Sequence, residues 1–204
     1  MARDRLPSTM RKRSLLSFLA FAVLTGVFWG GVEWLEKRKR RAQYQARYEM
    51  ETRLAAVCAG EGVPEAAAYP STSALHPILY VKQTTTGFST DFGYPTPENW
   101  EPQRLEEAEL VACIVEDQVE QQRCSYTLED GRKGTVVRVQ YRVSVTLRAA
   151  QTGAIIATSE GLMGGPPPAC QDTEQFQANR LTRYIGGSRP NEAIVEWLRT
   201  YVGP

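Results

Sequence analysis

A strict two-residue alternation constrains the fold of this chain more than any other sequence feature. From Val137 to Arg148, six apolar residues alternate with six polar residues without a break. Successive side chains of a β-strand point to opposite faces of a sheet, so this pattern is typical of a strand with one face in a core and the other in water. Such half-solvated strands favour an antiparallel sheet, because parallel sheets are covered on both faces.

Turn signals on both sides place this strand in the middle of a predicted meander. Asp130-Gly131 precedes it and Thr152-Gly153 follows it, and such pairs are typical of hairpin turns. The other expected strands are short apolar runs, at 76–81, 109–117, 125–128 and 154–159.

Helices are predicted on either side of the sheet segment. Residues 33–59 contain no proline or glycine and are rich in helix formers, with a thin apolar stripe. We interpret them as a charged stalk; the alternative is a helix that pairs with the helix of a partner. Near the C-terminus, Ile194, Leu198 and Tyr201 recur at helical spacing after Pro190. This pattern predicts an amphipathic helix that covers one face of the sheet.

The first forty residues contain an uncharged apolar stretch. Residues 14–32 are 19 residues without a charge, which as a helix span about 28 Å, close to the thickness of the bilayer hydrocarbon. A cleaved signal peptide is the alternative, but no small-residue cleavage site follows. We therefore expect a transmembrane helix over 14–34, in which Gly26 and Gly30 form a small-xxx-small packing pattern.

Orientation in the membrane does not follow from the flanking charges, because basic residues stand on both sides of the stretch. Four cysteines decide it: Cys58, Cys113, Cys124 and Cys170. None are spaced as C-x-x-C, so neither a zinc site nor a thioredoxin-type motif is expected. An even number of cysteines behind a membrane segment favours disulfides and an oxidising compartment, although four buried free thiols are the alternative.

The cysteine pairing depends on the predicted strand register. If 109–117 pairs with 120–128 through a turn at 118–119, Cys113 and Cys124 face each other and can form a disulfide. Cys58 and Cys170 would then form the second disulfide.

Together these patterns predict an α+β chain. Its expected parts are a cytoplasmic tail (1–13), a transmembrane helix (14–34), a helical stalk (35–60) and a small antiparallel β-sheet domain outside the cytoplasm (61–204), which ends in the amphipathic helix. The expected location is the cell membrane, with a single pass and the C-terminal domain outside.

Short motifs in a fixed order resemble an uncharacterised family of bacterial extracytoplasmic domains. They are CAGEGVPEAAAY, HPI, WEP, LVACIVE, CSY, AAQTG, PPPAC and VEWLRTYV, between Cys58 and Val202. The resemblance implies an exported domain with paired cysteines, found behind an anchor or a signal sequence. It implies no particular activity.

Composition argues against several functions. With 24 Lys and Arg against 23 Asp and Glu, the chain lacks the basic excess of nucleic-acid-binding proteins. The single histidine, His76, leaves little material for a His-based catalytic triad or metal site. Glu116 and Asp117 are adjacent in a predicted strand and should point to opposite faces, which disfavours an acid–base pair. We therefore expect no enzyme, no catalytic residue, no metal and no cofactor.

Two functions remain from the sequence. The first is a non-enzymatic interaction or accessory role, for example as a small subunit of a membrane complex; its expected partners are the lipid bilayer, other membrane-protein subunits or a second copy held through the membrane helix. The alternative is a surface module that binds anionic or polysaccharide ligands. Its candidate contacts are an arginine row and a loop of aromatic residues: Arg138, Arg142, Arg148, Phe88, Phe92, Tyr94 and Trp100.

Overall fold

The computed structural model of the chain describes residues 34–70, 74–85, 87–90, 94 and 96–203. The chain divides into two compact units, residues 1–48 and 49–204. The predicted membrane segment, including Gly26 and Gly30, lies outside the described residues except for Trp34. Among the helices that are described, none is both long enough and apolar enough to cross a membrane. The predicted four-part division stays a prediction.

An α-helix occupies residues 34–55 and continues into the 3-10 helix η1 (Ala56–Ala59), which ends at Gly60. Residues 34–48 of this helix are exposed along their whole length. From residue 49 onward the helix belongs to the second unit, where Met50, Leu54 and Val57 are buried. The thin apolar stripe of the sequence is therefore the part of the helix that packs.

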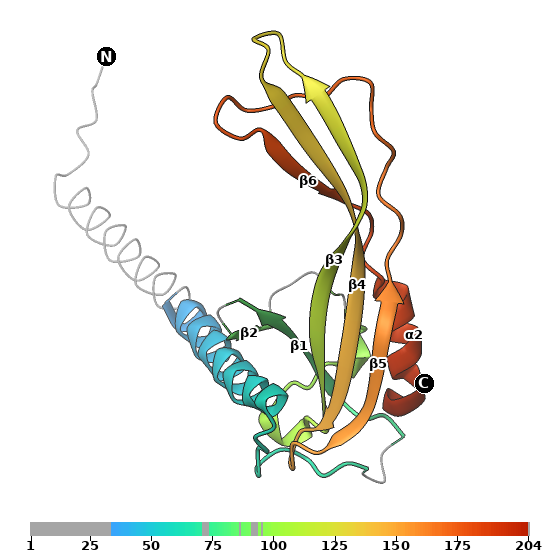
Figure 1. Cartoon of the computed structure of the whole chain (residues 1–204). Helices are drawn as coiled ribbons and strands as arrows, with labels where there is room; N and C mark the ends of the chain where they lie inside the picture. Colours follow the sequence, from blue (N-terminus) through green and yellow to red (C-terminus); the bar gives the residue numbers. More distant parts are fainter. Residues whose placement is uncertain (1–33, 71–73, 86, 91–93, 95, 204) are drawn as a thin grey trace, which may run out of the picture. The chain divides into compact units, whose positions relative to one another are not determined.

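In the part of the chain that the structure describes, six strands form one sheet (Figure 1). The strands are β1 (Ile78–Thr84), β2 (Gly87–Ser89), β3 (Leu110–Thr127), β4 (Lys133–Ala149), β5 (Ile155–Met163) and β6 (Thr182–Gly186). Their order is β2-β1-β3-β4-β5, and β6 pairs with β4 beyond the end of the β4–β5 ladder.

The sheet is mixed, so the predicted antiparallel domain is wrong. β1 runs parallel to β3, and β6 runs parallel to β4. Parallel neighbours need a long crossover connection. Residues 85–109, which include β2, connect β1 to β3, and residues 150–181, which include β5, connect β4 to β6. The sequence signal failed because only β4 carries a clear alternation, and alternation in one strand does not determine the direction of its neighbours.

β3 is a single strand of 18 residues, not the predicted pair of strands with a turn at 118–119. It pairs with β4 along its whole length, from Leu110 opposite Ala149 to Thr127 opposite Lys133, with a bulge between Glu120 and Gln122. Gln118 and Val119 are poor turn residues, so the strand continues through them. The chain reverses instead at Gly131, which has a φ of 81° that glycine adopts without strain.

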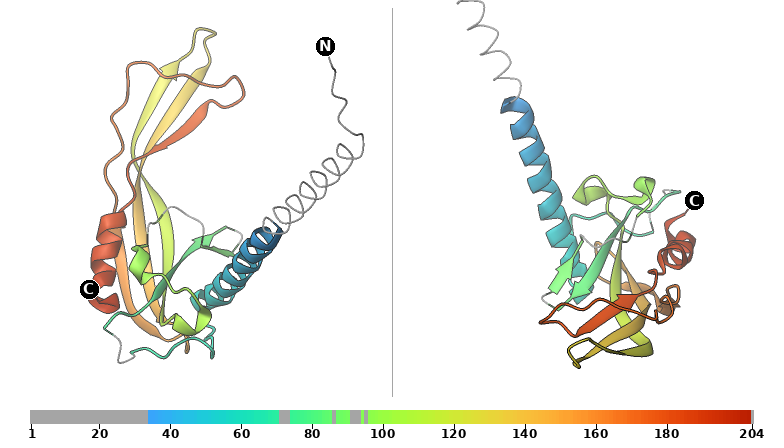
Figure 2. Two further views of the ribbon diagram at one scale, coloured as in Figure 1. Left: turned by 180° about the vertical axis from the view of Figure 1, so that it is seen from behind. Right: turned by 90° about the horizontal axis from the view of Figure 1, so that it is seen from above.

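Two hydrophobic clusters cover opposite faces of one half of the sheet. On one face, α2 (Asn191–Val202) packs Ile194, Leu198 and Val202 against β1, β3 and β4. On the other face, the end of the N-terminal helix and η1 pack against β1 and β3. Figure 2 shows α2 lying along this half of the sheet. The predicted C-terminal helix and its packing on the sheet are therefore present.

The other half of the sheet extends past both clusters as an arm. We use this name for residues 118–139 of the β3–β4 hairpin, the loop 164–181 and β6; they form the end of the sheet away from α2 in Figure 1. Among the described residues, neither hydrophobic cluster includes a residue of the arm. Its described buried residues are few: Cys124, Gly134, Val136, Val137, Arg138 and Val139. Cross-links and polar contacts therefore have to hold the arm in shape.

Candidate functional site

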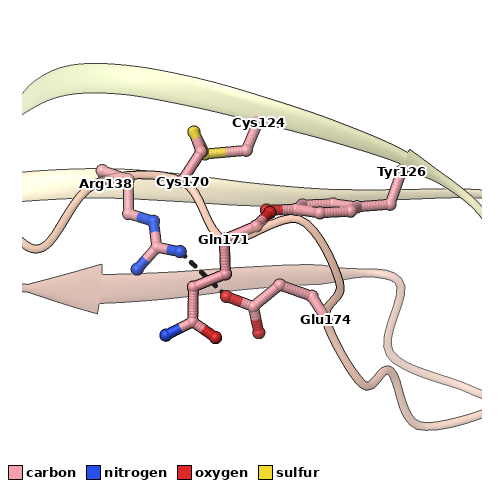
Figure 3. The surroundings of a disulfide bond; sticks show 6 residues. All are labelled: Cys124, Tyr126, Arg138, Cys170, Gln171 and Glu174. Atoms are coloured by element: carbon pink, nitrogen blue, oxygen red, sulfur yellow. Dashed lines mark hydrogen bonds and ion pairs between the residues drawn. A yellow bond between two sulfur atoms is a disulfide. The ribbon is translucent and has the colours of Figure 1, made fainter.

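The loop 164–181 is fastened across one face of the arm (Figure 3). A disulfide joins Cys124 in β3 to Cys170 in the loop, with Cα atoms 5.9 Å apart. Next to it, the hydroxyl of Tyr126 donates a hydrogen bond of 2.9 Å to the carbonyl oxygen of Gln171. Farther along the loop, Arg132 donates to the carbonyl oxygen of Ala178 at 2.7 Å. The loop thus has a defined position, although it contains almost no regular structure.

A buried ion pair joins the same loop to β4. The guanidinium of Arg138 in β4 donates to Glu174 Oε1 at 2.8 Å, and the two side chains are 1% and 8% exposed. Arg183 in β6 donates to Glu174 Oε2 at 3.1 Å. One carboxylate therefore joins two strands to the loop. A buried charge is tolerated when it is paired and hydrogen-bonded, and both oxygens of Glu174 have a partner.

Phe176 separates two hollows on the arm. Its ring lies against Gly134, where any Cβ would come within 2.7 Å of the ring, and beside Tyr126 at a centroid distance of 5.7 Å. One hollow, of about 700 Å³, lies between the hairpin end and the loop. The other, of about 480 Å³, lies between the loop and β6. Phe176 lines both hollows.

The two hollows have opposite charge. The larger one is lined by four carboxylates, those of Glu129, Asp130, Asp172 and Glu174, and by no basic side chain. The smaller one is lined by Arg180 and Arg183 together with Gln175, Gln177 and Tyr184, and by no acidic side chain. The arm therefore presents an acidic and a basic surface on the two sides of one aromatic ring.

A second charged constellation lies where the arm joins the body of the sheet. Glu116 of β3 is 8% exposed and accepts hydrogen bonds at 2.6 Å from both Lys82 and Arg189. The hydroxyl of Tyr94 donates to the same carboxylate at 2.5 Å. The guanidinium of Arg189 also stacks on the ring of Tyr141, 5.0 Å from its centroid. These contacts join β1, β3, β4 and the start of α2.

The carboxyl of Glu116 is strongly acidic in the folded protein. Burial acts to raise its pKa, but the hydrogen bonds from its three donors outweigh burial and lower the pKa from 4.5 to about 2. A carboxyl with this pKa is ionised at neutral pH and has no proton to donate. We call this cluster the junction, because its contacts join β1, β3 and β4 to the start of α2.

We predict that the pH dependence of stability reports this junction. A pKa lowered in the folded state stabilises the protein above the unfolded value of 4.5, and this stability is lost as the pH falls to about 2. In Glu116→Gln the decline over this window should be smaller than in the wild type by about 2–3 kcal/mol. Urea unfolding at pH 2.5, 4 and 6 measures the difference.

If the free energy of unfolding falls equally with decreasing pH in the wild type and in Glu116→Gln, the lowered pKa of Glu116 is contradicted. Asp117→Asn is the matched control, because Asp117 is the neighbouring carboxylate and pairs with Arg142 at 3.3 Å on the surface, where both side chains are at least half exposed. Its effect on the pH dependence should be small, since surface ion pairs contribute little.

The predicted arginine row of β4 is not an exposed row of free guanidiniums in the structure. Arg138 is buried in its ion pair with Glu174, which corrects the expectation that this side of β4 faces water. Arg142 pairs with Asp117 on the surface. Arg148 donates to the carbonyl oxygen of Gly153 at 2.7 Å and lines a small hollow beside the disulfide of Cys58. The alternation predicted the strand correctly but could not show that a loop covers its polar side.

The predicted aromatic loop is likewise not an exposed surface. Tyr94 and Trp100 are 7% and 3% exposed and belong to the cluster under α2. Phe88, in β2, is 39% exposed. Phe92 lies outside the described residues. Two of the four aromatic residues therefore contribute to the core.

All four cysteines form disulfides, as expected, but the predicted pairing is wrong. Cys58 bonds to Cys113, and Cys124 bonds to Cys170. Cys113 and Cys124 cannot face each other, because they lie on the same continuous strand. The first disulfide joins η1 to the body of the sheet, and the second fastens the arm loop.

The single histidine of the chain is engaged by two neighbours. His76 Nδ1 lies 2.7 Å from Glu109 Oε2, and its ring packs edge-on against Tyr69. No group of three or more His, Cys, Asp or Glu side chains within the described ranges could hold a metal ion.

Sequence analysis missed the residues that build both constellations, namely Lys82, Glu174, Phe176 and Arg189, because each stands in a segment without periodicity or motif.

Comparisons of the chain with protein-family models, with curated proteins and with solved structures found no match. No family is therefore identified, and the resemblance to a family of bacterial extracytoplasmic domains stays a prediction. Of the features that this resemblance implies, the two disulfides are present.

Proposed function

We propose that this chain is a membrane-held extracytoplasmic protein without enzymatic activity, and that its arm binds another protein. The observation that supports this role most directly is the fastened loop. A disulfide, a buried ion pair and four hydrogen bonds from side chains to loop carbonyls hold residues that contribute nothing to either hydrophobic cluster. Binding residues are commonly carried on loops that a rigid scaffold holds in place.

The extracytoplasmic part of the proposal is supported by the disulfides. The bonds connect residues 55 and 46 positions apart, and both contribute to holding the second unit together. Structural disulfides of this kind persist in oxidising compartments and are rare in the cytosol. Association with the membrane is supported by the uncharged sequence of residues 14–32 alone.

An interaction role is favoured over catalysis by the state of the charged groups. The buried carboxylates of Glu116 and Glu174 each accept hydrogen bonds from two cations. Groups engaged in this way stabilise the fold and have no proton or open coordination position to offer to a substrate. The accessory role, for example as a small subunit of a membrane complex, follows from this combination.

The basic hollow supports a second candidate function, as a module for anionic polysaccharides. Arg180, Arg183 and the amides of Gln175 and Gln177 surround it, with the ring of Tyr184 at its side. Guanidinium and amide groups beside an aromatic ring suit a charged sugar. Arg183 is already engaged by Glu174 and by the carbonyl oxygen of Gln175, which leaves Arg180 as the main anion contact and makes this function the weaker of the two.

Thiol labelling of the full-length chain in intact cells tests the proposed compartment. A membrane-impermeant maleimide should label no cysteine without reductant, and should label the cysteines once an impermeant reductant has been added. A Cys-less variant with serine at positions 58, 113, 124 and 170 is the control for background. Thiols that react without reductant, and only after the cells are permeabilised, would contradict the proposal.

Native gel migration after mild detergent extraction tests the interaction role. The wild-type chain should migrate in an assembly larger than one copy. A chain that migrates as a single copy at its native level, and that binds an anionic polysaccharide, would favour the second candidate instead.

A further inference from the structure

The free edge of the sheet is a poor binding site. β1 pairs with β3 only as far as Ile114, so the outer edge of β3 from Val115 to Thr127 has no strand partner among the described residues. This edge carries a bulge between Glu120 and Gln122, and the bulge brings Glu120 and Arg123 together as an ion pair of 2.7 Å. Bulges and charged side chains are the usual means by which proteins prevent an edge from pairing with another strand. This edge is therefore unsuited to pairing with a strand of a partner.

The charges beside Phe176 are only partly compensated within the chain. On the acidic side, Glu129 and Asp172 are exposed and make no ion pair with any residue that the structure describes. On the basic side, the same holds for the exposed guanidinium of Arg180. These three side chains lie at the rim of the two hollows, and Phe176 lies between them.

This arrangement complements itself under a two-fold rotation. If two arms face each other with their Phe176 side chains near the axis, the acidic hollow of each copy meets the basic hollow of the other. An interface with two-fold symmetry requires this kind of self-complementary surface. An apolar centre with a polar rim is also the common composition of protein interfaces.

We propose that the arm binds a second copy of this chain through Phe176 and the two oppositely charged hollows. The inference rests on the proposed function and names the partner. A small anion or an anionic sugar would engage only the basic hollow and would leave Glu129 and Asp172 without a role. A second copy engages both hollows. The chain carries both an acidic and a basic hollow, so each hollow meets one of opposite charge on the second copy.

A charge-reversal exchange with the full-length chain tests this proposal. Two copies with different affinity tags are co-expressed, extracted in mild detergent, and recovered on one tag. The wild-type copies should be recovered together. Arg180→Glu in both copies should reduce co-recovery at least about fivefold, and Asp172→Arg with Glu129→Arg in both copies should do the same, because like charges then face each other.

The decisive measurement combines the two kinds of variant. A copy with Arg180→Glu and a copy with Asp172→Arg and Glu129→Arg should recover each other better than either recovers itself, since both symmetric charge contacts of the mixed pair have opposite signs, one as in the wild type and one reversed. Co-recovery should also fall as salt is raised from 0.05 to 0.5 M, because exposed charges are screened. Arg199→Glu on α2 is the control, as Arg199 is exposed and distant from the arm in sequence and fold.

Three results would overturn the second-copy proposal. They are wild-type copies that do not recover each other, co-recovery that neither reversal changes, and opposite variants that fail to restore it. If a different protein is recovered and lost with Arg180→Glu, the arm binds that protein and the proposed function stands without self-association. Association through residues 14–34 alone would be seen as co-recovery that is insensitive to all arm variants.

Discussion

Replacing Cys58 and Cys113 together by serine is expected to lower the free energy of unfolding by about 4 kcal/mol. The bond between them closes a sequence separation of 55 residues, and in the chain-entropy model a loop of this length stabilises the folded state by about 4 kcal/mol. It also joins η1 to β3 inside the cluster formed by Leu54, Val57 and Val111. Small domains rarely have more than 5–15 kcal/mol of stability in total, so the loss should be large.

Guanidinium-induced unfolding of the full chain in detergent, followed by circular dichroism under non-oxidising conditions, measures this effect. Both cysteines are replaced together so that no odd thiol remains to form a wrong bond. Serine at positions 124 and 170 is the matched comparison: it removes the bond that fastens the arm loop and should make residues 164–181 the first site of proteolysis. An unchanged unfolding midpoint in the Cys58/Cys113 variant would show that η1 is held by packing alone.

The parts of the fold that the sequence predicted correctly have a strong period. The alternation over 137–148 falls within β4, where Val143, Val145 and Leu147 are buried under α2. The spacing of Ile194 and Leu198 corresponds to the buried side of α2. In both cases one face of an element packs on a core and the other does not, which is the condition under which periodicity appears in a sequence.

The parts that were missed depend on contacts between distant segments. Nothing in the sequence 171–181 indicates that it covers β4, so the burial of Arg138 could not be foreseen. The pairing of β6 with β4 has the same cause, because a five-residue strand after an irregular loop carries almost no period. The disulfide pairing failed for a related reason, since it depended on a strand register that was inferred from local turn signals alone.

The charged surface around Phe176 could be predicted from the sequence even less well than the fold. Its charges, Glu129, Asp172 and Arg180, come from the hairpin end and from two parts of the loop. Each is an ordinary surface residue in the sequence, and only the folded loop brings them to opposite sides of Phe176. A sequence reveals binding residues when a motif keeps them at fixed spacing, and here the Cys124–Cys170 bond and the buried ion pair set their positions instead.

The largest effect of a single substitution is expected at that buried ion pair. Glu174→Gln removes the carboxylate that two guanidiniums share and leaves Arg138, 1% exposed, as a buried charge without a partner. Breaking a buried ion pair in this way costs about 3–5 kcal/mol. Urea unfolding measures the total, and amide hydrogen exchange of β6 shows whether the loss is local to the arm.

The geometry also predicts unequal effects for the three members of the group. Arg138→Met should be less destabilising than Glu174→Gln, because Glu174 keeps its contact with Arg183 at 3.1 Å. Arg183→Met, at a side chain that is 39% exposed, should cost about 1 kcal/mol or less. The double variant Arg138→Met with Glu174→Gln should be more stable than Glu174→Gln alone, since the unpaired buried charge is gone. If the double variant instead shows the sum of the two single losses, Arg138 and Glu174 act independently and the ion pair does not hold the loop.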